Sequence, residues 1–375
     1  MKYRLVELLT DIQDGSQLQV ENAEVQSVGF GERLTAVKCK QFCGLKNRPL
    51  AATNLTAQDC MKCYSQEIVS GQLVSASGNL YPIVRGIPRL LAGETKGWVE
   101  KNQKTFSLEW KMFRFGERNW GQDIETRKTL FLRAIGVKPQ DLKGKLIFDA
   151  GCGSGLLSME LANSFGMEVV ALDLAFGIEQ AYTHNKNPFV YFIQGSVLDL
   201  PLKNETVDFL YCAGVLVALP DAKQGFKALK PALKPGGRYF IWMYHPIDAR
   251  HHPKDKRKMK VYNWIRKNVT SRLPIGVQHA LFLAAISFYV LKRTLMNLFR
   301  AEKDTRTWRE KMQALTDMFS PVYQQRFTEE EIVEWFREEG LVDAQTAYCE
   351  HYGFGTRGDM PAFAASSVLN KQFGS

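Results

Sequence analysis

The sequence predicts an α/β fold whose centre is a doubly wound parallel sheet. Between Lys145 and Tyr244, short runs rich in β-branched and aromatic residues alternate with helical patterns, which indicates parallel strands joined by helices. Three glycines at alternate positions follow the first run, in "LIFDAGCGSGLLSMELA". The longest apolar stretch, Ala280 to Leu291, is shorter than the roughly 20 residues that a membrane span needs, so we expect no transmembrane segment.

Each predicted element has its own local signal. The predicted strands are 145–150, 168–173, 190–195, 207–214 and 237–244, and the helices between them are 155–165, 177–185 and 222–233. An apolar face over 126–137 predicts a further helix, with Gly136 as its C-cap. Thr328 and Glu331 form a capping-box pattern ahead of another helix, which we expect to end at Gly340.

Shifts in composition divide the chain into five segments. We predict a small β-rich N-terminal domain over 1–95, a helical cap over 96–144, a ligand-binding core over 145–245, a helical lid insertion over 246–327, and a C-terminal segment over 328–375 that completes the sheet. Two prolines in "YPIVRGIPRLLAG" favour strand and turn at the end of the first segment.

The charge and the cysteine content bear on the binding partners and the cellular compartment of the protein. The formal net charge of +10 suits nucleic acid or an anionic membrane surface without choosing between them, and much of the excess lies between Arg250 and Arg272. Such a run also fits a solvated helix face. The N-terminus has no apolar core of signal-peptide length, and the seven cysteines are an odd number. We therefore expect a reduced, cytoplasmic protein, with peripheral association at the inner face of the membrane as an extension.

The glycine loop favours a ligand without phosphates at the binding position. A dinucleotide fingerprint needs its third glycine where this chain has Leu156, and a triphosphate loop needs a Gly-Lys-Ser/Thr ending that is missing here. S-adenosylmethionine fits better, because its amino-acid end and sulfonium must approach the backbone closely, as glycine permits. Asp149 can receive the ammonium group of this cofactor, and Asp173 can accept hydrogen bonds from both ribose hydroxyls.

Four motifs in order now carry a family resemblance. The stretches "IFDAGCGSG", "VVALDLA", "FIQGSVLDLPLKNETVDFLYCAGVL" and "LKPGGRYFIW" resemble the cofactor domain of class I S-adenosylmethionine-dependent methyltransferases. The resemblance covers residues 145–245 and implies a seven-stranded Rossmann-like sheet. It implies this set of cofactor-binding residues: Asp149, Gly151, Gly153, Gly155, Asp173, Leu174, Ser196, Val197, Ala213, Phe106 and Trp110.

The chain departs from the family pattern at two places. Many members carry an adenine-binding aspartate where this chain has Ser196, so we expect backbone and apolar contacts to hold the adenine. Small-molecule members often read "VLHH" after the fourth strand, whereas "VLVA" here excludes a histidine base from that loop. Phe106 and Trp110 lie four residues apart on a segment that resembles the helix closing over the cofactor, although ordinary amphipathic packing explains that spacing equally well.

The N-terminal segment carries a candidate zinc site. "YPIVRGIPRLL" resembles the end of the zinc-ribbon domain found in the activator subunit of tRNA and protein methyltransferases, and Cys60 and Cys63 match the first cysteine pair of that domain. Ser75 and Gly78 stand where the second pair should be. Cys39 and Cys43 can complete a four-thiolate zinc site from upstream. The alternative is a degenerate ribbon with four free thiols.

The acceptor side of the site has weaker signals. Tyr244 and His245 follow the fifth strand and are the candidate catalytic residues, with His245 either a general base or a structural histidine before Pro246. The basic and apolar halves of the lid favour an acceptor with an anionic head and a greasy tail.

The predicted function is therefore methyl transfer to a small-molecule, lipid-like or glycan-intermediate acceptor. The alternatives are an RNA base methyltransferase, disfavoured because the charge lies in the lid and no Asn/Asp-Pro-Pro-Tyr/Phe motif follows the fourth strand, and a non-catalytic partner that binds cofactor.

Overall fold

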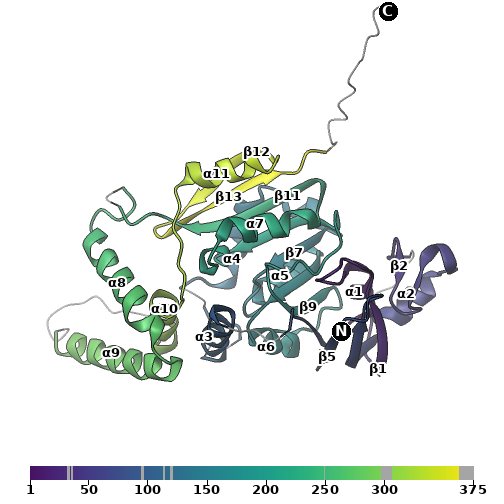
Figure 1. The fold of residues 1–375 in the computed structure, drawn as a ribbon, viewed down its shortest axis with the longest axis horizontal. Coiled ribbons are helices and arrows are strands. Elements are labelled where there is room, and N and C mark those ends of the chain that lie inside the picture. Colours follow the sequence, from purple (N-terminus) through teal and green to yellow (C-terminus); the bar gives the residue numbers. More distant parts are fainter. Residues whose placement is uncertain are drawn as a thin grey trace, which may run out of the picture.

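The computed structural model describes residues 1–31, 34, 37–93, 97–112, 115–118, 121–248, 250–296 and 306–362, with backbone alone over 291–296. Parts of the predicted helical cap, the predicted lid at 297–305 and the C-terminal segment beyond 362 lie outside these ranges. A central twisted sheet forms the body of the protein, with helices on both of its faces (Figure 1). The N-terminal strands extend one end of this body, and α8, α9 and α10 project from the other.

The N-terminal part is mostly antiparallel sheet with two short helices. In chain order its elements are α1 (Tyr3–Leu8), β1 (Gln19–Ser27), β2 (Phe42–Cys43), β3 (Arg48–Pro49), η1 (Leu50–Ala52), α2 (Ala57–Tyr64), β4 (Gln66–Val74), β5 (Leu80–Val84) and β6 (Ile87–Leu90). Helix α2 begins with a capping box between Thr56 and Asp59, which explains why it starts directly after the polar loop.

The central part alternates strand and helix as the sequence predicts. Its elements are α3 (Trp98–Met112), α4 (Ile124–Ile135), η2 (Pro139–Leu142), β7 (Leu146–Ala150), α5 (Leu156–Phe165), β8 (Glu168–Asp173), α6 (Gly177–His184), β9 (Val190–Gly195), β10 (Val207–Ala213), η3 (Leu216–Ala218), α7 (Ala222–Leu229), η4 (Lys230–Ala232) and β11 (Leu233–Tyr244). Asp123 caps the start of α4, and Gly136 ends this helix in the left-handed conformation; the sequence predicts the second of these two caps.

Helices dominate the C-terminal part until two strands close the sheet. Its elements are α8 (Lys256–Asn268), η5 (Thr270–Arg272), α9 (Ile275–Met296), α10 (Trp308–Phe319), α11 (Glu329–Glu338), β12 (Val342–Cys349) and β13 (Gly353–Asp359). The predicted capping box of Thr328 and Glu331 begins α11. None of the described helices is long and apolar enough to cross a membrane.

The sheet is larger than the seven strands that the sequence predicts. Within the described residues it has eleven strands, in the order β1-β4-β5-β6-β9-β8-β7-β10-β11-β13-β12. Strands β7 to β13 make up the seven predicted ones, with β13 antiparallel to β11. The other four join because β6 pairs in parallel with β9, through Arg89 with Gln194 and Leu90 with Gly195. This pairing covers an edge that would otherwise expose unpaired backbone groups.

Both faces of the central sheet are buried. Leu146, Phe148 and Ala150 of β7 pack into a core that α7 and α11 cover, whereas Ile147 packs into a second core under α4, α5 and α6. Successive residues of a strand point to opposite faces, so this alternation defines the doubly wound arrangement. The first core continues into the N-terminal part through Leu5 of α1 and other apolar residues there.

Candidate active site

The glycine loop lies at the carboxyl end of β7, where parallel sheets bind their ligands. Gly151, Gly153 and Gly155 all have positive φ, between +58° and +93°, so the loop depends on glycine at these positions. The amide of Gly151 donates to the carbonyl of Leu172 at 2.7 Å, which holds the loop against the end of β8. Helix α5 begins directly after Gly155.

Asp173 reaches the glycine loop from the end of β8. Its carboxylate accepts hydrogen bonds from the amides of Gly153 and Ala175, each at 2.7 Å. Burial raises the pKa of Asp173, while the amides that donate to it act in the opposite direction. The structure thus brings together two predicted cofactor residues that lie 20 positions apart. The carbonyl of Leu174, the next residue, accepts from Gln103 and from Gln194.

Helix α3 covers this loop. A Cβ added at Gly153 would lie 2.3 Å from the indole of Trp110, so the ring rests directly on the glycine backbone. Trp110 is buried and packs with Ala175, and Phe106 packs beside them. The Ser107 hydroxyl accepts from the amide of Phe176 at 3.0 Å, which ties the helix to the loop after β8. The two aromatic residues of the predicted cap therefore lie over the predicted cofactor residues.

Asp149 lies beneath the loop and is almost fully buried. Burial raises its pKa to about 6, although the hydrogen bond from the Ser158 hydroxyl and the charge of Arg127 lower it. Arg127 comes from α4 and is itself half-buried. The carboxyl group of Asp149 therefore titrates close to the physiological range.

The remaining predicted cofactor residues lie at the ends of the neighbouring strands. Ser196 and Val197 follow β9, and Ala213 ends β10. The Ser196 hydroxyl accepts from the amide of Leu198 at 3.1 Å, and the Val197 side chain is buried. Since β9, β8, β7 and β10 are adjacent in the sheet, all these residues lie at the same edge, where the carboxyl ends of these strands meet.

A pair of acidic side chains missed in the sequence completes the site. Glu109 of α3 is 2 % exposed, and its carboxyl group interacts with the charges of Asp317 on α10 and of Asp173. The Tyr244 hydroxyl donates to Asp317 at 2.9 Å, and the Arg326 guanidinium lies 5.1 Å from the centre of the Tyr244 ring. No spacing in the sequence connects positions 109 and 317. The local signal in the sequence was a glutamate that stands between apolar residues in the segment that forms α3.

The two carboxyl groups differ in their charge state. Burial and the neighbouring charge of Asp317 raise the pKa of Glu109. Burial also raises the pKa of Asp317, but the hydrogen bond from Tyr244 and the charge of Arg326 lower it. We assign the proton to Glu109 and the negative charge to Asp317, because each accepts a hydrogen bond, Glu109 from Gln313 and Asp317 from Tyr244, but Asp317 also has the cation Arg326 beside it.

His245 follows the last residue of β11, and its ring packs against His251 and Phe354. It is buried, and its ring stacks on the ring of His251 with the centroids 4.2 Å apart. Burial lowers the pKa of His245, and the charge of His251 lowers it further. Tyr244 and His245 therefore belong to two different groups of side chains.

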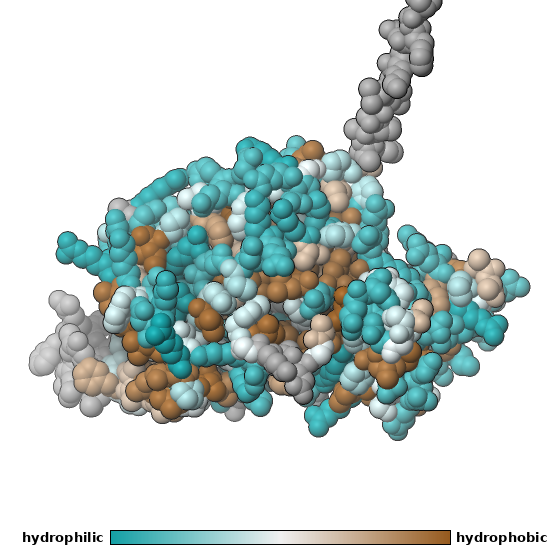
Figure 2. Space-filling model, viewed as in Figure 1, coloured by the Kyte–Doolittle hydropathy of each residue, from teal (hydrophilic) through white to brown (hydrophobic). Residues whose placement is uncertain are grey.

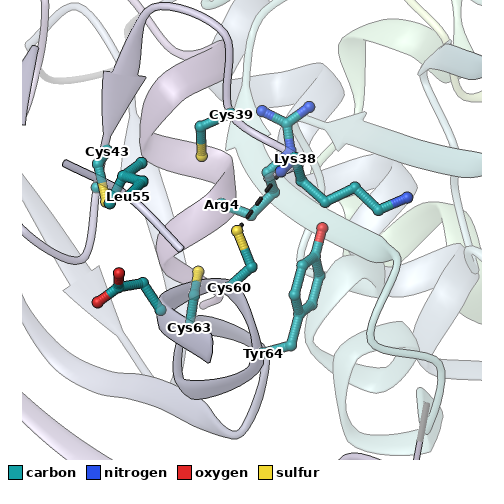
Figure 3. A pocket seen from close by; sticks show the side chains of 10 residues that line it. Arg4, Lys38, Cys39, Cys43, Leu55, Cys60, Cys63 and Tyr64 are labelled. Carbon is teal, nitrogen blue, oxygen red and sulfur yellow. Dashed lines mark hydrogen bonds between the residues drawn. The ribbon is translucent and has the colours of Figure 1, made fainter. Parts of the chain in front are cut away.

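The four predicted zinc ligands line one pocket. Cys39, Cys43, Cys60 and Cys63 surround it together with Arg4, Lys38, Leu55 and Tyr64 (Figure 3). The amide of Lys38 donates to the sulfur of Cys60 at 3.5 Å. Burial raises the pKa of Cys63 to about 12. Among the described residues, three potential ligands lie mutually within 4.8 Å only at His245, His251 and Glu329, so the thiols are spaced more widely than around a bound ion.

The comparisons agree with this geometry over the central segment. A family model described as "Methyltransferase domain" matches residues 148–241. The segment that holds the glycine loop and Asp173 is therefore similar to a methyltransferase domain.

Curated relatives match this part of the chain. A ubiquinone biosynthesis O-methyltransferase of Xanthomonas oryzae pv. oryzae is 37 % identical over 106 residues, which are 27 % of this chain and 44 % of the relative. A malonyl-[acyl-carrier protein] O-methyltransferase of Hahella chejuensis is 34 % identical over 102 residues, covering 27 % and 35 %. A tRNA U34 carboxymethyltransferase of Campylobacter fetus is 30 % identical over 122 residues, covering 32 % and 43 %. The chain spans about half or less of the curated relatives that it matches.

Solved structures resemble a larger part of the chain at low identity. A chain from the complex between the Haloferax volcanii Trm112 methyltransferase activator and a methyltransferase is 15 % identical, with a TM-score of 0.43 over 72 % of this chain and 99 % of that one. The magnesium protoporphyrin IX methyltransferase of Synechocystis, with bound SAH, is 15 % identical, with a TM-score of 0.42 over 70 % of this chain and 99 % of that one.

Proposed function

We propose that this protein transfers the methyl group of S-adenosylmethionine to a hydroxyl group of a small-molecule, lipid-like or glycan-intermediate acceptor. The observation that carries the proposal is the hydrogen bond from the amide of Gly153 to Asp173, which supports Asp173 as the residue that accepts the ribose hydroxyls. Relatives named for ubiquinone and malonyl-carrier O-methylation support an oxygen acceptor. The relative named for tRNA U34 supports the alternative, RNA.

Different residues of the chain would bind different parts of the cofactor. The carboxylate of Asp173 would accept the ribose hydroxyls, and Asp149 would face the ammonium group. Ser196, Val197, Leu174 and Ala213 would border the adenine with backbone and apolar contacts. Trp110 and Phe106 would close over the bound cofactor, and because the indole rests on Gly153, α3 must shift for a ligand to reach that backbone.

Tyr244 and Asp317 would handle the proton of the acceptor. S-adenosylmethionine supplies, when bound, an electrophilic methyl group on a positively charged sulfur. The Tyr244 oxygen would take the proton of the acceptor hydroxyl while its own proton moves to Asp317 along their hydrogen bond of 2.9 Å. The charge of Arg326 would favour the ionised form of Asp317 before this step, and Glu109 would stay protonated. Such base catalysis typically contributes about 10²–10⁴-fold to the rate.

Label transfer from radioactive S-adenosylmethionine tests the proposal. The full chain is incubated with a cell extract, which is then separated into RNA, protein, lipid and small-molecule fractions. We expect label in the lipid or small-molecule fraction. Tyr244→Phe and Asp317→Asn should lower the transfer rate by about 10²-fold or more with unchanged cofactor affinity, whereas the exposed Asp343→Asn should change neither. Label in RNA alone would establish the alternative function.

The four cysteines would hold a structural zinc ion. Their convergence on one pocket supports this, and zinc at about 2.3 Å from each sulfur would draw the thiols closer together. Elemental analysis of protein prepared without chelator should find about one zinc per chain at this site, lost in Cys60→Ser together with Cys63→Ser. Full retention of zinc in that double variant would disprove the assignment.

Helices α8 and α9 would associate with an anionic membrane surface. Exposed Arg257, Lys258 and Lys260 on α8 flank the exposed Trp264, and Phe288 on α9 is 69 % exposed. Figure 2 shows hydrophobic side chains gathered over α9 at the lower left. A basic helix beside exposed apolar side chains suits the headgroup region of such a surface. At that surface the protein would reach an acceptor with an apolar tail.

A further inference from the structure

A second group of potential metal ligands lies outside the methyl-transfer site. Four of the protein's six histidines gather beyond the carboxyl end of β11. The rings of His245 and His251 stack with centroids 4.2 Å apart, and those of His252 and His351 lie 5.8 Å apart, edge to face. Neither the cofactor residues nor Tyr244 and Asp317 belong to this group.

Two of these histidines and a nearby glutamate already have the spacing of metal ligands. One ligand atom from each of His245, His251 and Glu329 lies within 4.8 Å of the others. Glu329 is the first residue of α11 and lies outside the capping box of that helix, and its carboxylate accepts a hydrogen bond from the Cys349 thiol. The three residues come from the end of β11, the loop after it and a helix that begins almost 80 positions later.

His245 is held as a preorganised ligand would be. Its side chain is 3 % exposed, and its Nδ1 atom is buried without a hydrogen-bond partner among the described residues. The backbone is fixed on both sides, since its amide donates to Tyr352 and its carbonyl accepts from Arg326, both at 3.0 Å. Phe354 packs on the ring with the centroids 5.0 Å apart. A buried ring nitrogen without a partner is costly unless something binds it.

His251 is oriented by a carboxylate. Its Nδ1 atom lies 2.9 Å from Asp248 Oδ1, and its backbone amide donates to the same oxygen at 2.9 Å. A carboxylate on one ring nitrogen fixes the tautomer and leaves the other nitrogen free to bind a metal, which is the usual arrangement around metal-bound histidines. Asp248 would therefore support the site without binding the ion.

We propose that His245, His251 and Glu329 bind a divalent transition-metal ion of the zinc class. Two imidazoles and one carboxylate are a donor set that Zn²⁺ takes from proteins with three ligands, leaving a fourth position for water or another group. Harder ions such as Mg²⁺ prefer oxygen ligands and fit this set less well. The ion would satisfy the orphaned nitrogen of His245 and offset the negative charge of Glu329.

The site would fasten the inserted helices to the catalytic core. His251 lies on the loop that leads into α8, whereas His245 and Glu329 belong to elements of the sheet and its covering helix. An ion bound to all three would fix the angle at which this loop leaves the sheet. His245 would then act as a metal ligand and not as the general base that the sequence predicts.

Metal titration of the full chain tests the proposal. Metal-free protein is titrated with Zn²⁺ against a chromophoric chelator, and with Co²⁺, whose absorption separates thiolate from nitrogen and oxygen ligands. We expect one equivalent without thiolate charge-transfer absorption. His251→Ala and Glu329→Gln should weaken that equivalent about tenfold or more, a loss typical even of outer-shell residues. Zn²⁺ should also raise the melting temperature of the native protein by more than that of these variants, in which only the cysteine site remains.

Matched variants separate this site from other causes. His184→Ala, at an exposed histidine of α6, and Glu330→Gln, at the next residue of α11, should keep the full affinity. Cys60→Ser should remove only absorption that involves thiolate. The proposal fails if the native chain binds no Zn²⁺ outside the cysteines, or if His251→Ala and Glu329→Gln bind it as tightly as the controls.

Discussion

Asp173 binds two backbone amides of the loops that would surround a ribose, so its removal affects both the ligand and the loops. We predict that Asp173→Ala lowers the affinity for S-adenosylhomocysteine by about 1.5–3 kcal/mol, the scale of hydrogen bonds to a charged group. Calorimetry measures this directly. The exposed Asp141→Ala serves as the control and should bind normally. Unchanged affinity in Asp173→Ala would remove the basis of the cofactor assignment.

Asp149 makes the binding of the cofactor depend on pH. Burial raises the pKa of its carboxyl group to about 6 in the free protein, and only the ionised form attracts an ammonium group. Affinity should therefore fall as the pH drops through 6, by up to about tenfold per pH unit. For stability the sign is opposite, since a raised pKa stabilises the folded state at low pH and this contribution is lost as the pH rises through 6.

Calorimetric titrations between pH 5 and pH 8 measure this effect. Asp149→Asn has no charge to lose, so it should bind more weakly at pH 8 and show a flatter profile. An equally steep profile in that variant would assign the pH dependence to another group.

The sequence predicts site residues whose proximity follows from the order of motifs along the chain, and it misses those that only tertiary packing brings together. Gly153 and Asp173 lie in consecutive loops of one sheet, so the order of motifs along the chain predicts their proximity. Glu109 and Asp317 meet only because α3 and α10 fold onto the same edge, and nothing local determines that packing. The sequence names His245 as a candidate catalytic residue, but its proximity to His251 and Glu329 depends on tertiary structure in the same way.

At the scale of elements, α9 offers a direct test of the membrane proposal. Phe282 is buried against Ile286 and Met312, whereas Phe288 is 69 % exposed. We predict that Phe288→Ser weakens binding to anionic lipid vesicles and leaves thermal stability within about 0.5 kcal/mol. Phe282→Ser should instead destabilise the helical region by roughly 3 kcal/mol or more, as loss of a buried phenylalanine does.

Vesicle co-sedimentation at increasing salt measures the first effect, because screening weakens attraction between α8 and anionic lipid. Neutral vesicles serve as the reference. Equal binding of the native chain to neutral and anionic vesicles, or none to either, would exclude the proposed surface.

Element prediction succeeded where local pattern determines structure. The strands from β7 to β11 are buried runs that alternate with helical patterns, and the predicted caps at Gly136 and Thr328 follow from the residue types at these positions. The size of the sheet did not follow, because β6 and β9 pair through backbone groups across 100 positions. Backbone pairing of this kind leaves no side-chain signature.

At the scale of the whole molecule, the N-terminal part and the central part share one core. Leu5 and Leu73 belong to the same apolar cluster as Phe148 and Leu172. Arg4 also reaches across, with its Nε atom 3.0 Å from the Glu168 carboxylate of β8. Shared cores and a continuous sheet couple the unfolding of the parts that they join. The N-terminal part that carries the cysteines therefore shares the apolar core on which the stability of the central part also depends.

Leu5→Ala tests this coupling at a residue far from the glycine loop in the sequence. Leu5 is fully buried, so the substitution should cost about 2–5 kcal/mol of folding free energy. Because the core is shared, we predict a single unfolding transition at lower temperature and loss of hydrogen-exchange protection in β7 and β8 as well as in β4. Leu80→Ala is the matched control, since Leu80 lies in the same region but is 57 % exposed, and it should leave both measurements nearly unchanged. If Leu5→Ala loosens β4 while β7 and β8 keep their native protection, the two parts are independent units despite their continuous sheet.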